Sequence, residues 1–225
     1  MEGRRPVCVN VKGTHGSGKS SLCRSLLESD PARVPLRLEG WKMEVATYSP
    51  RWNALVLGAY PQGRGGGCDH FHSTKEVKYL LNLFWDHDAP NLVYEGILVS
   101  SIRSPMLEFM LYLNAFSKAQ REISYCFLDT PLSECLSRIY QRNGGRQINE
   151  RIVASKHSTI ARHAAYYRAS GIRCEVLDTS GSKQEVFERF TQLFSLGSGS
   201  SNESAIRGEE GDNQHGLCRS ECGRA

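Results

Sequence analysis

The chain has 225 residues and a net charge of +4, with 40% hydrophobic and 23% charged residues. These fractions are typical of globular proteins, so they exclude a fibrous or wholly disordered chain. The sequence has neither a run of roughly 18 apolar residues nor a secretory signal, so we expect no membrane span and a cytoplasmic protein whose eight cysteines are reduced.

Short apolar runs alternate with longer amphipathic segments along most of the chain. We predict strands over residues 7–11, 92–94, 123–128 and 172–177, extended segments over 36–48 and 54–60, and helices over 20–27, 75–85, 105–118, 132–141, 149–169 and 182–194. Strands that alternate with helices favour right-handed crossovers. The pattern therefore predicts a three-layer α/β fold, with a parallel sheet and helices on both faces.

The composition changes after residue 196. The last 29 residues are rich in glycine and serine and contain three basic and five acidic residues, which leaves residues 1–196 with 25 basic and 19 acidic residues and a net charge of +6. A segment with so few large apolar residues buries too little surface to offset the entropy lost on ordering. We predict one domain over 1–196 and a disordered polar tail over 197–225.

A phosphate-binding loop follows the first predicted strand. Residues 13–20 match the pattern G-x4-G-K-[ST] at every fixed position, and a helix is predicted directly afterwards. The backbone N–H groups of such a loop surround phosphate oxygens, while the lysine reaches the terminal phosphates and the serine hydroxyl coordinates Mg²⁺. The predicted nucleotide-binding residues here are Gly13, Thr14, His15, Gly16, Ser17, Gly18, Lys19, Ser20 and Ser21.

A carboxylate follows the strand at residues 92–94. Glu95 is expected at the edge where parallel strands end, which is where ligands bind in open α/β sheets. It is a candidate to hold Mg²⁺, through water, or to accept the proton of an attacking hydroxyl. The alternative is an ordinary acidic residue that caps a loop.

Arginines gather around the end of the helix at 132–141. Arg138 and Arg142 lie one helical turn apart, and Arg146 follows in a glycine-containing loop. Such a loop can close over a triphosphate and stabilise the transferred phosphoryl group, so we predict an arginine-rich lid that contacts ATP. The alternative is a solvated basic helix end.

The most unusual stretch contains a tyrosine, three glycines and a carboxylate. The predicted substrate-binding residues here are Tyr60, Gly66, Gly67, Cys68 and Asp69. Asp69 competes with Glu95 as the general base, because phosphoryl transfer needs only one. A turn-type aspartate in a flexible loop is the alternative, and Cys68, His70 and His72 would be a zinc site if they lay on one strand face.

These motifs resemble those of P-loop kinases related to thymidylate and deoxynucleoside kinases. The Leu-Gly-x-Tyr at 57–60, the Gly-Gly-Cys-Asp at 66–69 and the strand ending in Glu95-Gly96 look like those of bacteriophage kinases that phosphorylate 5-hydroxymethyluracil within DNA. A true thymidylate kinase has Asp-Arg-Tyr at the strand end, whereas this chain has Tyr94-Glu95-Gly96. That difference argues against free dTMP as the substrate.

The resemblance implies an ATP- and Mg²⁺-dependent phosphotransferase that acts on hydroxymethyluracil in phage DNA, a step toward hypermodified thymidine, in the host cytoplasm. Its catalytic residues would be Lys19, Glu95, Asp69 and Arg142, with Ser20 and Glu95 at the metal. The base would have to leave the helical stack to reach the site. Two alternatives remain, which are a kinase of a free nucleoside or nucleoside monophosphate and a nucleotide-binding switch without kinase activity.

Overall fold

The structure is a computed structural model that describes residues 5–61, 65–87 and 91–195. The predicted tail over 197–225 lies outside the described residues. One seven-stranded sheet has the strand order β2-β3-β4-β5-β1-β6-β7. Its strands are β1 (Val7–Lys12), β2 (Val34–Leu36), β3 (Ala46–Ser49), β4 (Ala54–Leu57), β5 (Asn91–Glu95), β6 (Glu122–Asp129) and β7 (Arg173–Asp178).

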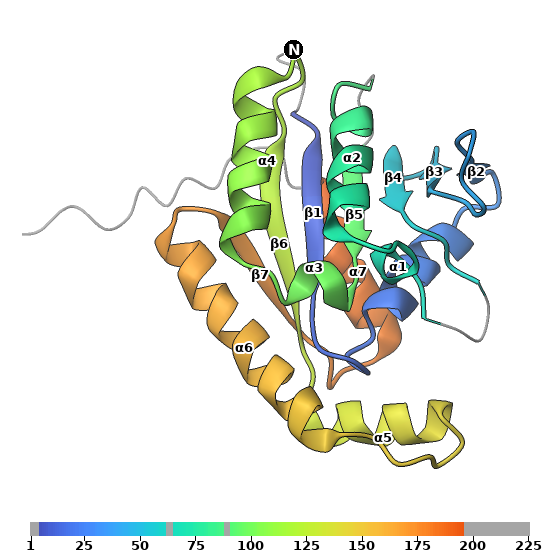
Figure 1. Ribbon diagram of the computed structural model, residues 1–225, viewed down its shortest axis with the longest axis vertical. Helices are drawn as coiled ribbons and strands as arrows, with labels where there is room; N and C mark the ends of the chain where they lie inside the picture. The colour runs from blue at the N-terminus through green and yellow to red at the C-terminus, as the bar shows by residue number, and fades with distance from the viewer. Residues whose placement is uncertain (1–4, 62–64, 88–90, 196–225) are drawn as a thin grey trace, which may run out of the picture.

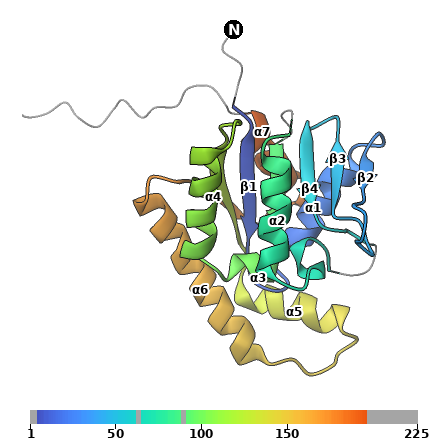
Figure 2. The same cartoon turned by 45° about the horizontal axis from the view of Figure 1, so that its top comes forward.

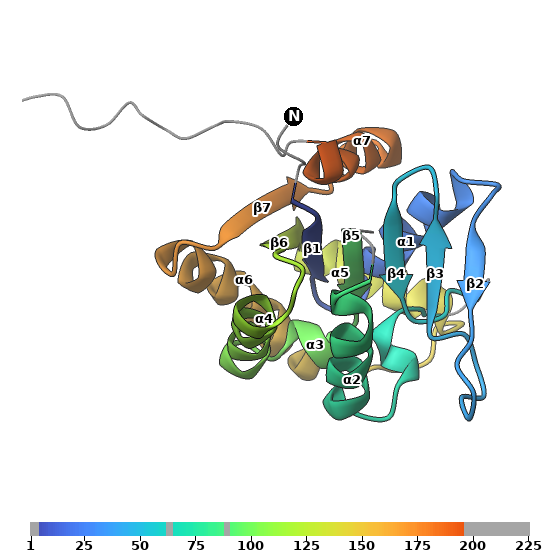
Figure 3. The same cartoon turned by 90° about the horizontal axis from the view of Figure 1, so that it is seen from above.

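Helices cover both faces of this sheet, as Figures 1 and 3 show. They are α1 (Lys19–Glu28), α2 (Thr74–Trp85), α3 (Ile97–Ser100), α4 (Ser104–Phe116), α5 (Leu132–Arg142), α6 (Glu150–Ala169) and α7 (Lys183–Ser195), with a short 3-10 helix η1 (Cys68–His70). α1 and α7 pack on one face, while α2, α4 and α6 pack on the other. The predicted three-layer α/β fold is confirmed.

The central strand β1 shows how the sequence specifies these layers. Successive side chains of a strand point to opposite faces. Val7, Val9 and Val11 accordingly pack with the helices α1 and α7, whereas Cys8 packs with the α2 and α4 layer. Every residue of β1 is buried, as expected for the middle strand of a sheet covered on both sides.

The edge of the sheet differs from the prediction. β4, β5, β1, β6 and β7 are parallel to their neighbours, but β3 is antiparallel to both β2 and β4. The segment predicted as extended over 36–48 therefore includes only the last residue of β2 and the first part of β3, in a sheet that is mixed. β2 contains Pro35, which has no N–H to donate, and this explains why it is short and lies at the edge.

Two further elements were not expected. α3 is a four-residue helix directly after β5, and it is too short to show a helical period in the sequence. Cys68 and His70 lie in η1 rather than on a strand, because Gly67 turns the chain at a φ of 72°. Within the described residues, no helix combines the length and the apolar character needed to cross a bilayer.

Candidate functional site

The phosphate-binding loop connects β1 to α1 at the edge where the parallel strands end (Figure 1). Gly16 has a φ of 76°, and a Cβ atom there would lie 2.3 Å from the carbonyl oxygen of Cys135 in α5. Both the backbone conformation and the approach of α5 therefore require glycine. Lys19 is the first residue of α1, so the loop directs the N-terminal end of this helix toward the bound ligand.

The side chains of this loop are largely enclosed. The ammonium group of Lys19 is buried and donates a hydrogen bond to the carbonyl oxygen of Thr14 at 3.0 Å. Burial lowers the pKa of Lys19, while the charges of Glu95 and Asp69 raise it. The hydroxyl of Ser20 accepts a hydrogen bond from the N–H of Gly66 at 3.3 Å, which joins the loop to the glycine-rich stretch.

Glu95 lies next to Lys19 because β5 pairs with β1, with Glu95 opposite Val11. Its side chain is fully buried, and neither carboxylate oxygen has a hydrogen-bond partner among the described residues. Burial raises the pKa of Glu95 to about 7, although the charge of Lys19 and the nearby hydroxyl of Ser20 act in the opposite direction. A Cβ atom on Gly67 would lie 2.3 Å from Oε1 of Glu95, so glycine there leaves room for the carboxylate.

Asp69 lies in η1, close to the same edge, and its side chain is exposed. Its Oδ1 accepts a hydrogen bond from the N–H of Leu98 at 3.1 Å, which holds the first turn of α3. Its charge raises the pKa values of Lys19 and His15, so it faces the phosphate-binding loop. The structure thus brings together both carboxylates that the sequence singled out.

The other predicted substrate residues line the same region. Cys68 is buried, and burial raises the pKa of its thiol well above the ordinary value. Tyr60 is half-buried and donates its hydroxyl hydrogen to the carbonyl oxygen of Leu57 at 3.3 Å. The zinc alternative is wrong, because among the described residues no group of three histidine, cysteine, aspartate or glutamate side chains is arranged to hold a metal ion.

The predicted lid consists of α5, α6 and the connection between them. Arg138 donates a hydrogen bond to the carbonyl oxygen of Gly16 at 3.3 Å and forms an ion pair with Glu134. Arg142 ends α5 and Arg146 lies in the connection, and both are exposed.

The charges of the lid extend to the phosphate-binding loop. Burial lowers the pKa of His15, and the positive charges of Lys19, Lys156 and Arg142 lower it further. The charge of Arg142 therefore acts on the loop, while its contact with ATP stays a prediction. Ser21, in contrast, is exposed on α1, and Thr14 donates its hydroxyl hydrogen to the carbonyl oxygen of Val153 in α6 at 3.4 Å.

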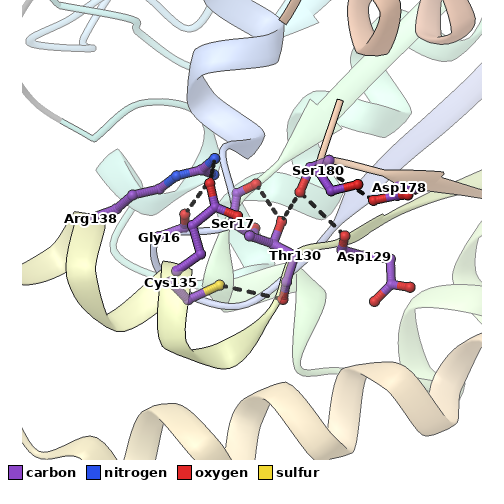
Figure 4. Close-up of polar contacts among 10 residues, drawn as sticks. Gly16, Ser17, Asp129, Thr130, Cys135, Arg138, Asp178 and Ser180 are labelled. Atoms are coloured by element: carbon purple, nitrogen blue, oxygen red, sulfur yellow. Dashed lines mark hydrogen bonds and ion pairs between the residues drawn. The ribbon is translucent and has the colours of Figure 1, made fainter. Parts of the chain in front are cut away.

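Thr130 is a structural centre that the sequence analysis missed, and Figure 4 shows its contacts. Its hydroxyl donates to the carbonyl oxygen of Ser17 at 3.0 Å and lies 2.7 Å from the hydroxyl of Thr179. Its carbonyl oxygen lies 3.0 Å from Nε2 of His157 in α6 and accepts from the thiol of Cys135. The phosphate-binding loop, the lid and the end of β7 thus meet at one residue, which in the sequence is marked only by a Thr-Pro pair at the end of a strand.

Lys12 also lies outside the predicted set. Its side chain is completely buried, and its ammonium group donates hydrogen bonds to the carbonyl oxygens of Val99, Ser100 and Ile102 at 3.1, 3.2 and 3.1 Å. Burial lowers the pKa of Lys12 to about 7. Lys12 ties the strand that precedes the phosphate-binding loop to the end of α3, whose first turn Asp69 holds.

Comparisons with known proteins match this site to one family. The model of the 5-hmdU DNA kinase family matches residues 3–173. The chain is 37% identical to the 5-hmdU DNA kinase of Pseudomonas phage M6 over 159 residues, which are 68% of this chain and 81% of the relative. It is 30% identical to 5-hmdU DNA kinase 1 of Salmonella phage ViI over 176 residues, which are 75% of each chain.

Among solved structures, the chain is similar to a gluconokinase from Sinorhizobium meliloti 1021, with a TM-score of 0.44 and 14% identity over 86% of this chain and 94% of that one. The family model, in contrast, spans the phosphate-binding loop, both carboxylates and the lid. This protein is an ATP-dependent kinase that belongs to the 5-hmdU DNA kinase family.

Proposed function

We propose that this protein transfers the γ-phosphoryl group of ATP to the hydroxymethyl oxygen of 5-hydroxymethyluracil in DNA. The observation that carries the proposal is the buried carboxylate of Glu95, which lies beside Lys19 and close to the hydroxyl of Ser20, the residues of such loops that contact phosphate and Mg²⁺. The names of the relatives from phages M6 and ViI support DNA as the carrier of the acceptor.

The phosphate-binding loop and the lid bind the triphosphate. Backbone N–H groups of residues 13–20 surround the phosphate oxygens, and Lys19 contacts the terminal phosphates. Arg138, Arg142 and Arg146 supply further positive charge from the lid, and Arg138 already contacts the loop at Gly16. Positive charge aimed at the transferred group stabilises the transition state.

The site fits a divalent cation. Hard cations such as Mg²⁺ prefer oxygen ligands. The hydroxyl of Ser20 in the loop and the carboxylate of Glu95 at the end of β5 both supply oxygen atoms. The two unpartnered oxygens of Glu95 are costly to bury without a ligand. Bound Mg²⁺ would neutralise negative charge on the phosphates. We propose Ser20 and Glu95 as the residues that hold it, directly or through water.

Asp69 is the better candidate for the general base. It is exposed toward the open side of the site, and its hydrogen bond to the backbone of Leu98 fixes its position. The hydroxymethyl oxygen forms a bond to the γ-phosphorus while the bond from that phosphorus to the bridging oxygen breaks and ADP leaves. The proton of the hydroxyl passes to the carboxylate of Asp69.

The acceptor base binds against the glycine-rich stretch. Gly66 and Gly67 bring this stretch against Tyr60 and Glu95, because a Cβ atom would lie 2.6 Å from the Tyr60 ring on Gly66 and 2.3 Å from Oε1 of Glu95 on Gly67. A base within a duplex must leave the stack to reach such a site. Single-stranded DNA avoids that cost, so we expect it to be phosphorylated at least as well as duplex DNA.

The test is transfer of label from γ-labelled ATP in the presence of Mg²⁺. The acceptors are single-stranded and duplex DNA with 5-hydroxymethyluracil, the same DNA with thymine, and the free nucleoside. We expect label only in DNA that contains the modified base, and none with the variant Lys19→Ala. Label in the free nucleoside alone would contradict DNA as the substrate, and nucleotide hydrolysis without any labelled acceptor would indicate a nucleotide switch.

A further inference from the structure

Apart from Glu150 at its first position, the helix α6 and the chain that follows it up to Cys174 carry positive charge only. Between Glu150 and Glu175 there are 24 residues without an aspartate or glutamate, and they include five lysines or arginines and two histidines. α6 spans most of this segment. Figures 1 and 2 show α6 beginning near α5, beyond the edge where the strands end, and running obliquely back along β7, past α3 and the first turn of α4.

Arg103 lies next to α6 and is held in place by two tyrosines of that helix. It immediately precedes α4 and is exposed, and its guanidinium carbon lies 4.1 Å from the centre of the Tyr166 ring of α6. The hydroxyl of Tyr167 donates a hydrogen bond to its carbonyl oxygen at 3.2 Å. Stacking orients the guanidinium plane and leaves its N–H edges available for a planar anion such as phosphate.

Arg162 provides a second cation on the same side. It lies four residues before Tyr166 on α6, so the two side chains share a face of the helix. Burial lowers the pKa of His163, and the charges of Lys12, Arg103 and Arg162 contribute to its final value of about 4, so both arginines lie near this histidine. In the part of the chain that the structure describes, neither arginine has a carboxylate within ion-pair distance.

Arg103 and Arg162 extend the group of basic residues at the nucleotide site toward Asp69 and the proposed acceptor site. Lys156 of α6 and Arg142 act on His15 in the phosphate-binding loop. Arg103 lies after α3, the helix whose first turn is held by Asp69. The triphosphate occupies the loop, so Arg103 and Arg162 are left for a different anion that approaches from the acceptor side. The first turn of α4 also contains no acidic residue that would repel such an anion.

We propose that Arg103, Arg162 and Tyr166 bind the backbone of the DNA strand that carries the acceptor base, with both arginines on phosphates. This inference deepens the proposed function and rests on it for the identity of the partner. Arginine contacts to phosphate fix the position of a nucleic acid without reading its sequence. The contacts therefore place the strand over the site, and the modified base is selected elsewhere.

The test measures binding of fluorescently labelled single-stranded DNA without the modified base, by anisotropy, without nucleotide and at several KCl concentrations. We expect Arg103→Ala and Arg162→Ala each to weaken binding about tenfold, as for the loss of one charge-assisted contact. Each should also reduce the slope of log affinity against log salt by about one. ATP affinity should stay unchanged, since neither residue contacts the nucleotide.

Arg51→Ala is the matched control. Arg51 is also exposed and stacks on an aromatic ring, with its guanidinium carbon 5.1 Å from the centre of the Trp52 ring. It precedes β4 and therefore lies at the end of the sheet where the parallel strands begin, opposite to the phosphate-binding loop. The control loses the same charge and the same kind of stacking, so we expect it to bind DNA nearly as well as the unaltered protein.

Three outcomes would overturn the inference. They are no binding of DNA at low salt, unchanged affinity and salt slope in Arg103→Ala and Arg162→Ala, or an equal loss in Arg51→Ala. The binding assay needs no phosphoryl transfer, so its result is separate from the test of the proposed function. If the two variants lose DNA affinity but no labelled DNA forms, the proposed function fails and the binding surface stands. Thermal melting of each variant checks that it is folded.

Discussion

Replacement of Lys12 by methionine tests whether burial controls the charge of this lysine. The side chain is completely buried and its pKa is lowered to about 7, whereas an unfolded lysine keeps a pKa near 10.4. Between these two values the unfolded chain binds more protons than the folded one, so the free energy of unfolding rises with pH. From pH 7 to pH 9 the rise from this group is about 2 kcal/mol.

The measurement is urea unfolding of both proteins at pH 7, 8 and 9. Because the other titrating groups are shared, their contributions cancel in the difference between the proteins. We expect the unaltered protein to gain about 2 kcal/mol relative to Lys12→Met across this range. A difference that does not change with pH would refute the reasoning. It would mean that the three carbonyl oxygens bonded to Lys12 stabilise its charge enough to offset burial.

Further predictions concern the carboxylates, the glycine beside them and the lid. We expect Glu95→Gln to raise the Mg²⁺ concentration needed for half-maximal activity. Asp69→Asn should lower kcat by about a hundredfold at saturating Mg²⁺ and leave the Mg²⁺ requirement unchanged. The reverse pattern in Mg²⁺ titrations would exchange the roles of the two carboxylates. Gly67→Ala places a Cβ atom against Glu95, so kcat should fall at least about tenfold through the loss of one metal contact. Gly65→Ala is the control, because a Cβ atom there meets no atom within 4 Å, and it should be active in the same assay. Thr130→Val should cost about 1 kcal/mol of stability and raise the KM for ATP severalfold in steady-state assays, and unchanged values would show that its hydroxyl does not hold the loop.

The parts of the site that obey local rules could be predicted from the sequence. The phosphate-binding loop is recognisable because its glycines and lysine are needed at fixed spacing, and Glu95 because it follows a buried strand directly. The positions of Lys19, Glu95 and Asp69 near one another agree with that reasoning. Their roles in catalysis stay predictions until the variants are measured.

The missed features depend on contacts between distant segments. Lys12 looks like the polar end of an apolar strand, and the carbonyl oxygens that bind it come from α3 and the residues just after it. Thr130 resembles any residue at a strand end until the lid and β7 pack around it. The zinc alternative required Cys68 and His70 to lie on one strand face, and the structure excludes this because a glycine with positive φ turns the chain directly before them.

The contrast between Lys12 and Glu95 helps to separate structural from functional buried charges. Both side chains are fully buried, and burial shifts the pKa of each to about 7. Lys12 has three hydrogen-bond acceptors from its own chain, so its desolvation is partly compensated in the absence of any ligand. Glu95 has no hydrogen bond of normal length among the described residues, although it lies beside Lys19 and the hydroxyl of Ser20, both of which lower its pKa. A buried carboxylate with so few partners is costly, so the structure retains at Glu95 a polar group that is available to a ligand.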